Sequence, residues 1–350
     1  MKPDLHRRPI TVAWELTRAC ALKCRHCRAE AITRRSADEL STDEGRALID
    51  EIAALGTKIL VMTGGDPLVR PDLVELVRHA DARGLHVALS PAVTGRLRRE
   101  RLAELAAAGV TSVHLSVDGA NARTHDGLRA VRGSFDRSRA ALDWVAELGM
   151  RLQVGTSVTA ETVGDLPALA EQLADHPVTM WSLFFLVPTG RGRDLQFLDA
   201  EAHERTLTWL AHAAEVLPFG VRTTAAPTYR RIRSELGYEP PPAGTANDGK
   251  GFCFVSHNGE VHPSGFLPIA VGSVRSDSLA DLYRHAPLMQ ALRDPAQLRG
   301  ACGRCSWAQT CGGSRARAFA LTGDPLASDP TCQVASSGAG PSHPGPGVKA

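Results

Sequence analysis

Three cysteines lie close together near the start of the chain, at Cys20, Cys24 and Cys27. Their C-x3-C-x2-C spacing follows an apolar run, Ile10 to Leu16, that is typical of a buried strand. Three cysteines cannot by themselves complete the four-ligand shell of a structural zinc ion. They can bind three irons of a [4Fe-4S] cluster and leave the fourth iron open, where a small molecule can bind and react.

Zinc and disulfides are the alternative uses of such closely spaced cysteines. The three cysteines could bind zinc together with His26, since structural sites with three cysteines and one histidine are common. A disulfide framework is not expected, because the chain has 350 residues and no secretory signal sequence and therefore does not need such cross-links.

A second group of cysteines lies near the end of the chain, where Cys302, Cys305 and Cys311 have C-x2-C-x5-C spacing and Cys332 follows. Four thiolates are a full ligand set for a closed [4Fe-4S] cluster. The same four cysteines would also suit a structural zinc ribbon. In a further alternative, Cys332 is not a ligand and the cluster keeps an open iron for substrate.

The composition is that of an ordinary globular protein, with 43% hydrophobic and 22% charged residues. The net charge of +2 predicts no strong attraction to nucleic acid. No apolar run approaches the roughly 18 residues of a membrane-spanning helix, so we expect no membrane partner. Eight cysteines in a chain without a secretory signal indicate metal or redox use, which predicts a reducing, cytoplasmic location.

Between the two cysteine groups, apolar runs typical of strands alternate with segments of helical periodicity. Six such units predict an α/β fold with a parallel sheet, and chemistry is expected at the carboxyl ends of its strands. A doubly wound sheet is the alternative to a barrel. The predicted strands span residues 10–16, 58–63, 85–90, 111–117, 151–159 and 178–187, and the predicted helices span 41–55, 71–83, 97–108, 134–148, 163–175 and 201–217.

The first cysteine motif resembles the signature of the radical S-adenosylmethionine (SAM) superfamily, in which an aromatic-like residue, here His26, precedes the third cysteine. The resemblance covers about residues 10–332 and implies a partial (β/α)6 TIM-like barrel over residues 1–225. It also implies that the open iron of a [4Fe-4S] cluster takes the amino and carboxylate groups of SAM. One electron then cleaves SAM to methionine and a 5'-deoxyadenosyl radical.

The second cysteine group resembles the SPASM domain, which extends many radical SAM enzymes. This resemblance implies a second, auxiliary [4Fe-4S] cluster in a small Cys-rich SPASM/twitch-like domain over residues 251–334. A linker is predicted at 226–250, and a Ser/Gly/Pro-rich tail at 335–350 is predicted to be disordered. The start of the domain, 251–266, is predicted to form a β-hairpin that turns at Asn258-Gly259.

The SPASM pattern is incomplete, because Ala270 and Arg315 stand where two further cysteines are expected. We therefore expect a single auxiliary cluster. Cys253 is left with three open roles: an incomplete ligand, a proton or hydrogen-atom donor near substrate, or a buried small hydrophobe.

Gly64-Gly65-Asp66-Pro67, at the end of the second predicted strand, resembles the GGE motif of the superfamily with Asp in place of Glu. Two glycines let the backbone approach a ligand closely. Its carbonyls can then accept from the ammonium group of SAM, and the acid adds a matching negative charge. An ordinary turn is the alternative for this sequence.

Ser116 and Asp118 end the fourth predicted strand and face the same side, because they are two residues apart. They resemble the residues of the family that lie near the ribose and methionine of SAM. His26 could stack on the adenine, and Arg129 and Arg132 could reach a carboxylate. A strand-ending turn and solvated surface side chains are the alternatives.

The resemblance implies an enzyme, an oxidoreductase or lyase, that abstracts a hydrogen atom from a small-molecule substrate. The stretches 14–20 and 64–72 and the reduced cysteine count are most similar to the branch of haem and haem d1 biosynthesis, which predicts a tetrapyrrole or other carboxylate that loses or oxidises a side-chain carbon. The alternatives are a maturase of a ribosomal peptide or protein side chain, and a non-catalytic iron–sulfur or zinc protein. An electron donor such as flavodoxin or ferredoxin is the expected protein partner.

The cluster and zinc hypotheses predict different metal contents. If both cysteine groups bind clusters, protein reconstituted anaerobically with iron and sulfide is brown and holds about eight irons per chain, four in each cluster. Elemental analysis measures this ratio directly. A colourless protein with about one or two zinc ions would contradict the cluster hypothesis.

Overall fold

Seven parallel strands, one more than predicted, form the main sheet of this computed structural model, which describes residues 4–239 and 247–336. The additional strand, β7, was not predicted because its short polar sequence has no apolar run. Neighbouring strands pair in chain order from β1 to β7. Their bounds are β1 Thr11–Glu15, β2 Ile59–Thr63, β3 His86–Leu89, β4 Val110–Ser116, β5 Arg151–Val158, β6 Val178–Phe185 and β7 Gly220–Thr224.

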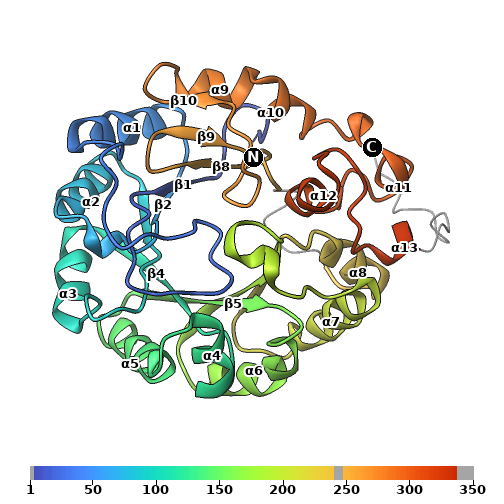
Figure 1. Cartoon of the computed structure of the whole chain (residues 1–350), viewed down its shortest axis with the longest axis horizontal. Helices are drawn as coiled ribbons and strands as arrows, with labels where there is room; N and C mark the ends of the chain where they lie inside the picture. Colours follow the sequence, from blue (N-terminus) through green and yellow to red (C-terminus); the bar gives the residue numbers. More distant parts are fainter. Residues whose placement is uncertain (1–3, 240–246, 337–350) are drawn as a thin grey trace.

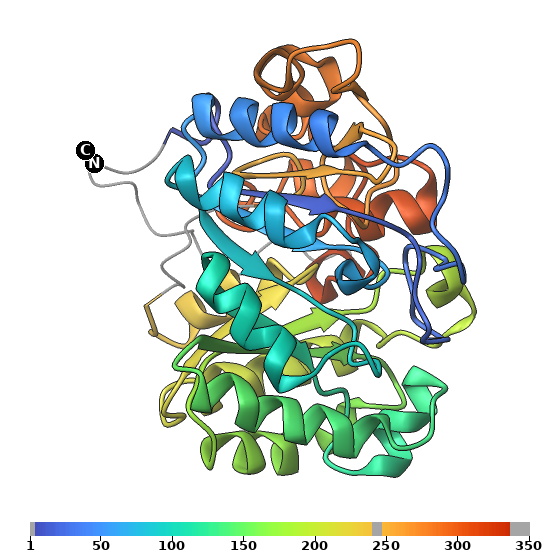
Figure 2. The same ribbon diagram turned by 90° about the vertical axis from the view of Figure 1, so that its left-hand side faces the viewer.

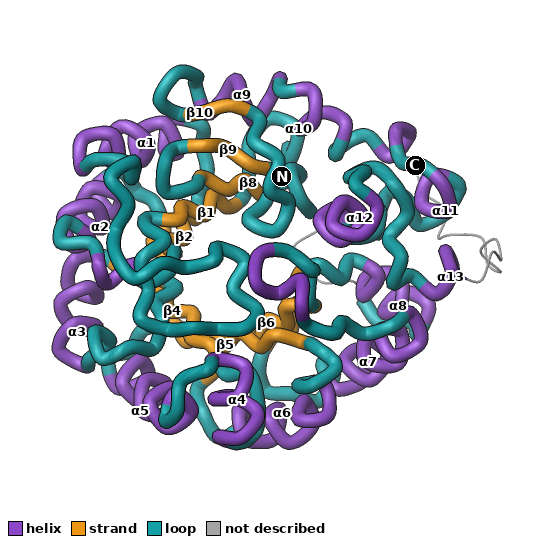
Figure 3. The backbone as a smooth tube through the Cα atoms, viewed as in Figure 1, coloured by secondary structure: helices purple, strands orange, loops and turns teal. Residues whose placement is uncertain are grey.

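Helices cover the outer face of this curved sheet, as Figures 1 and 3 show. The predicted six are present, and two more, α4 and α8, were missed because their sequences are strongly polar. Helix α8 lies within the predicted linker 226–250, where it buries Tyr229 and Ile232, so that part of the linker prediction is wrong. The bounds are α1 Thr42–Ala54, α2 Leu73–Ala82, α3 Arg99–Ala108, α4 Ala122–Arg129, α5 Ser134–Glu147, α6 Leu166–Ala174, α7 Ala200–Ala213 and α8 Thr228–Glu235, with short 3-10 helices η1 Pro67–Val69, η2 Val163–Asp165, η3 Gly190–Asp194 and η4 Pro295–Gln297.

The C-terminal region continues the same sheet. Strand β8, Phe252–Val255, pairs in parallel with β1, and β9, Glu260–His262, returns beside β8 through the predicted Asn258-Gly259 turn. The sheet therefore has the order β10-β9-β8-β1-β2-β3-β4-β5-β6-β7. The remaining elements are β10 Gly272–Ser273, α9 Leu279–His285, α10 Pro287–Ala291, α11 Gly300–Gly303, α12 Arg315–Thr322 and α13 Gln333–Ser336.

One hydrophobic core fills the space between the sheet and the helices, with Val12 and Trp14 of β1 fully buried in it. Helix α1 packs directly over Trp14 at Gly45, where a Cβ would lie 2.6 Å from the indole ring. No helix in the described ranges, 4–239 and 247–336, is long and apolar enough to cross a membrane. The predicted tail lies outside the described residues from position 337 onward.

A buried ion pair fixes the C-terminal cysteine segment to the barrel. Arg317 of α12 lies 3.3 Å from Asp329, and both side chains are almost completely buried. Arg317 also donates to the carbonyl of Leu186, just beyond β6, and to the hydroxyl of Thr331. Asp329 accepts from the backbone N–H of Ser314 at 2.8 Å. The segment that precedes Cys332 is therefore held by charge as well as by packing.

Removal of one partner should destabilise the protein strongly, because the other charge is left buried and unpaired. We expect Asp329→Ala to lower the free energy of unfolding by about 3–5 kcal/mol. Asp324→Ala, which breaks the partly exposed pair with Arg299, is the matched control and should cost less than about 1 kcal/mol. Urea denaturation followed by circular dichroism compares the variants. Equal shifts of the two midpoints would contradict this role for Asp329.

Candidate active site

The three cysteines of the first motif line one cavity of about 230 Å³ at the carboxyl end of the sheet. They lie in the loop that follows β1, which Figure 2 shows at the side toward which β1 points. Six other residues that the sequence analysis named as candidates line the same cavity: His26, Gly64, Gly65, Ser116, Asp118 and Arg129. The structure therefore brings together most of the residues that the sequence assigned to a SAM site.

Backbone hydrogen bonds join the cysteine loop to the glycine turn after β2. Gly65 N–H donates to the carbonyl of Thr17 at 2.7 Å, and Asp66 N–H donates to that of Ala19 at 2.8 Å. A Cβ at Gly64 would lie 2.6 Å from the Thr17 oxygen, and one at Gly65 would lie 2.5 Å from the Ala19 oxygen. Both positions therefore require glycine, because any side chain would push the cysteine loop away.

The environment of the thiols suits a metal cluster better than free cysteines. Burial raises the pKa of Cys20 to about 11, and burial also raises the pKa of Cys24. The negative charges of the other two cysteines would raise the Cys20 pKa further, so the three cannot readily be thiolates together without cations among them. Iron supplies those cations, and each thiolate of a cubane cluster binds a different iron.

Arg129 places a cation beside the first cysteine motif, with its guanidinium Nη1 3.7 Å from Cys24 Sγ. Its Nε donates to Asp118 Oδ2 at 2.6 Å, and the other oxygen of Asp118 accepts from Ser157 N–H at 2.7 Å. The pKa of Asp118 is held below its usual range by the Arg129 charge, against the effect of burial. Asp118 therefore positions Arg129, and Ser116 lies beside them on the cavity wall.

Asp66 and Pro67 are buried beside the cavity, and neither is part of its wall. Asp66 Oδ1 accepts from Leu68 N–H at 3.1 Å and caps η1, while Oδ2 accepts from the Thr94 hydroxyl at 2.8 Å. Burial raises the pKa of Asp66. In this arrangement the acid shapes the glycine turn, and the glycines themselves face the cavity.

His26 is enclosed at the cavity edge with its Nδ1 lacking a hydrogen-bond partner among the described residues, and burial lowers its pKa to about 4. Its ring is therefore neutral at physiological pH. Cys253 lies elsewhere: it is fully buried in the main hydrophobic core on β8 and does not line the cavity. Burial raises its pKa to about 12, which favours the third of its open roles, a buried small hydrophobe.

The four cysteines of the second group line a second cavity. Burial raises the pKa of Cys311 to about 12, and Gly313 N–H lies 3.5 Å from its sulfur. Arg315, at the position where the SPASM pattern has a cysteine, is buried and places its Nη2 3.7 Å from Cys302 Sγ. The remaining donors of Arg315 go to backbone carbonyls, which hold the guanidinium beside Cys302.

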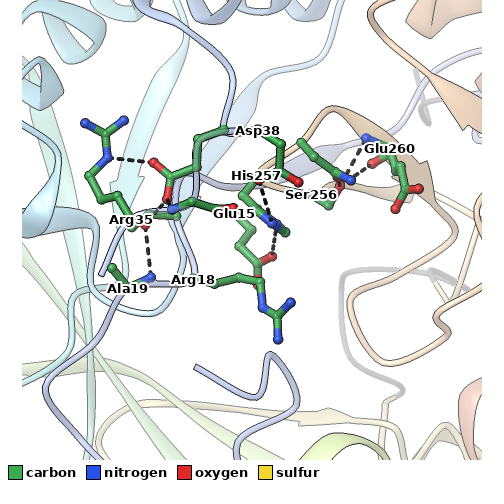
Figure 4. Close-up of polar contacts among 12 residues, drawn as sticks. Glu15, Arg18, Ala19, Arg35, Asp38, Ser256, His257 and Glu260 are labelled. Atoms are coloured by element: carbon green, nitrogen blue, oxygen red, sulfur yellow. Dashed lines mark hydrogen bonds and ion pairs between the residues drawn. The ribbon is translucent and has the colours of Figure 1, made fainter. Parts of the chain in front are cut away.

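An acid–base group that the sequence analysis missed connects the cysteine loop to the β8–β9 hairpin. Figure 4 shows Glu15 at the end of β1 facing His257 in the hairpin turn, and Glu15 Oε2 lies 3.3 Å from His257 Nδ1. Arg28, the residue after Cys27, lies 3.2 Å from Glu15 and stacks over the Phe254 ring at 4.4 Å. The pKa of Glu15 is lowered, because the Arg28 charge and the hydrogen bond with His257 outweigh the effect of burial. No sequence signal marked these contacts, since they join residues far apart in the chain.

Arg191, His114 and Phe184 also line the cavity without having been predicted. Arg191 donates to the carbonyls of Cys24 and Ala31, which ties the cysteine loop to η3. His114 has its Nδ1 3.3 Å from the Ser90 hydroxyl, and its ring contacts Phe184 edge to face. Burial lowers the pKa of His114 to about 4. His114 and Phe184 lie near the ends of β4 and β6, and Arg191 lies in η3; none of these positions carries a distinctive motif.

Comparison with known families matches residues 14–176 to the radical SAM superfamily. Over 338 residues the chain is 37% identical to an AdoMet-dependent heme synthase of Methanosarcina barkeri, and the match covers 93% of this chain and 96% of that protein. The chain belongs to the radical SAM superfamily.

Other relatives of this radical SAM enzyme are named for different reactions. It is 30% identical over 355 residues to an Fe-coproporphyrin III synthase of M. barkeri, covering 94% of this chain and 88% of the relative. It is 34% identical over 333 residues to the mycofactocin maturase MftC of Mycobacterium ulcerans, and this match covers 93% of this chain and 88% of that protein. Among solved structures, Streptococcus suis SuiB bound to S-adenosylmethionine has the same fold, with a TM-score of 0.75 at 15% identity over 93% of this chain and 78% of SuiB.

Membership of the superfamily implies a [4Fe-4S] cluster and SAM as cofactors, and the residues present fit both. Cys20, Cys24 and Cys27 can hold three irons, and the cavity beside them extends past Gly64 and Ser116. The second cavity has four thiols for an auxiliary cluster. The partial barrel and the two cofactor predictions are therefore confirmed.

The glycine turn gives a direct test of how the first cluster is positioned. Gly65→Ala should displace the cysteine loop, because its Cβ would overlap the Ala19 carbonyl, and the iron content should fall from about eight to about four per chain. Gly127→Ala in α4 is the control, since a Cβ there meets nothing within 4 Å. Measurement of the iron content of both variants after reconstitution tests this prediction. A Gly65→Ala protein with full iron content would show that the turn does not hold the loop.

Proposed function

We propose that this radical SAM enzyme converts carboxylate side chains of an iron tetrapyrrole by oxidative decarboxylation. The observation that carries the proposal is the 37% identity to a heme synthase over nearly the whole of both chains. Conversion of a propionate to a vinyl group releases CO2, one hydrogen atom and one electron. Such a reaction needs a hydrogen-atom acceptor, an electron acceptor and a pocket for a planar ring with acidic edges.

Part of the cavity wall suits an apolar planar ring. Phe184 of β6 and Phe266, which follows the β8–β9 hairpin, have ring centroids 6.4 Å apart, and Leu186 and Val187 extend the same wall. Val187 also packs with Leu267 in a small apolar cluster between the barrel and the C-terminal region. Aromatic and aliphatic surface stabilises a bound macrocycle by removing its faces from water.

When bound, a [4Fe-4S] cluster and SAM supply the 5'-deoxyadenosyl radical, and a second cluster supplies one-electron chemistry. We assign Gly64 and Gly65 to the wall that receives the ammonium group of SAM, with Asp66 maintaining their conformation. Ser116 and Arg129 present a hydroxyl and a guanidinium to the same ligand, and Asp118 orients the guanidinium. His26 and the other wall residues exclude water from the reacting groups.

The four C-terminal cysteines, including Cys332, are assigned to the auxiliary cluster. Its surroundings contain Arg231, which lines the cavity, and Arg315, which lies beside Cys302. Positive charge near the sulfur ligands favours the reduced form of a cluster, so this site suits an electron acceptor. We further propose that a flavodoxin or ferredoxin in the cytoplasm supplies the electron for SAM cleavage.

A second candidate function is maturation of a ribosomal peptide. The 34% identity to the mycofactocin maturase over nearly the same residues favours it. A peptide would need an extended groove, whereas a macrocycle needs a flat apolar wall. The two candidates therefore differ in the substrate that stimulates SAM cleavage.

Product analysis separates these candidates. Fe-coproporphyrin III, added with SAM and dithionite under anaerobic conditions, should raise 5'-deoxyadenosine well above the uncoupled background, and the porphyrin mass should fall by CO2 and two hydrogen atoms for each side chain converted. Cys24→Ala should abolish both signals, because one iron loses its ligand. Cys253→Ala should retain them, because that thiol lies in the core. Stimulation by a precursor peptide and not by the porphyrin would favour the maturase.

A further inference from the structure

Arg222 of β7 belongs to the same row of inward positions as the SAM-site residue Ser116. Ser116 pairs with Gly155, Gly155 with Ser182, and Ser182 with Arg222, across four adjacent strands. Register partners in a sheet point to the same face, so Arg222 faces the interior of the barrel. Along the sheet its Cα lies roughly 14 Å from that of Ser116, at about 4.8 Å per strand.

The guanidinium of Arg222 lies in an enclosed space that solvent can still enter. The residue is exposed, yet desolvation by the surrounding protein lowers its pKa. Both observations fit the strand register, which pairs Arg222 with the buried Ser182 on the inner face of the sheet. Its charge also lowers the pKa of His114, more than any other single charge does, and His114 lines the cavity. Arg222 is not itself one of the residues that line the cavity, but its charge reaches the cavity through His114.

Unlike Arg129 and Arg28, Arg222 has no anionic partner among the residues that the structure describes. Arg129 is paired with Asp118, and Arg28 with Glu15. Within the described part of the chain, the one hydrogen bond of Arg222 goes from Nη2 to the uncharged Ser182 hydroxyl at 3.0 Å, and no carboxylate acts on its pKa. An enclosed cation without an anion is unfavourable unless a ligand supplies the negative charge.

We propose that Arg222, with Ser182 holding its guanidinium, binds a carboxylate of the substrate on the far side of the cavity from Cys24. This inference rests on the proposed function and identifies the anchor for one acidic edge of the macrocycle. A planar guanidinium can bind a carboxylate through two parallel hydrogen bonds, which fixes the orientation of the ring as well as its position. The side chain to be converted would then lie at the opposite edge, toward the cysteines.

Binding of Fe-coproporphyrin III to the reconstituted enzyme, followed by absorbance titration, tests this assignment. Arg222→Met should weaken binding roughly ten- to hundredfold, as expected for loss of a charge-assisted hydrogen bond. Arg222→Lys should lose less, since it keeps the charge. Arg151→Met is the control, because Arg151 is an exposed arginine at the start of β5, the end of the strand away from the cysteine loop. This variant should bind the porphyrin as the unmodified protein does. Iron content and SAM cleavage without substrate should be unchanged in all three variants.

The tetramethyl ester of the same porphyrin provides a second test. The unmodified enzyme should bind the acid more tightly than the ester, and Arg222→Met should reduce this difference. Equal affinity of Arg222→Met and unmodified enzyme for the acid would overturn the role of Arg222 and leave the proposed function standing. Loss of iron or SAM cleavage in both Arg222 variants would overturn it in favour of a structural role. Absence of porphyrin binding to the unmodified enzyme would contradict the proposed function, and this inference with it.

Discussion

The close contact between two stretches of backbone determines where the chemistry can occur. The loop after β1 carries the three cysteines, and the turn after β2 carries two glycines that allow these backbones to pair without side chains between them. Both segments leave parallel strands at the same edge of the sheet, because β1 and β2 are neighbours in register. The cysteines are therefore fixed to a rigid sheet, which places the cluster beside the inward positions of the later strands.

The interior of the barrel combines compensated charges with an apolar wall. Asp118 and Glu15 use their charges to orient Arg129 and Arg28 near the cysteine loop. Phe184 and Phe266 form the apolar side, partly from the barrel and partly from the C-terminal region. Because β8 joins the sheet next to β1, the C-terminal region closes the cavity as well as carrying the second cysteine group.

The fold was predictable wherever a local pattern was strong. The strands β1 to β6 have apolar runs, and helices such as α1 have both periodicity and a capping box formed by Ser41 and Glu44. Strand β7 and helix α8 have polar sequences and form because tertiary packing buries a few of their residues. The parallel pairing of β8 with β1 joins residues far apart in the chain, so no local pattern could predict it.

The spacing of the cysteines and glycines along the chain predicted most of the site, whereas the chemical type of a single residue, such as Asp66, predicted less. Both cysteine groups, the two glycines and Ser116 and Asp118 line the two cavities as expected. Asp66 was assigned to the ligand because it stands where the GGE motif has its acid, but its oxygens are satisfied by Leu68 and Thr94.

The inward residues of later strands, among them His114 and Arg222, carry no motif. Their importance depends on which strands curve around the same space. Sequence spacing alone cannot supply this information, because it depends on the order and register of the whole sheet.

The central claim is that the first cysteine loop holds a cluster with one iron open to SAM. The most direct measurement is the electron paramagnetic resonance spectrum of a reduced Cys302→Ala/Cys305→Ala/Cys311→Ala protein, in which the first site alone can hold a cluster. The account predicts one [4Fe-4S] signal whose shape changes when SAM is added. A signal that SAM leaves unchanged, or a protein with no cluster in the first loop, would contradict it.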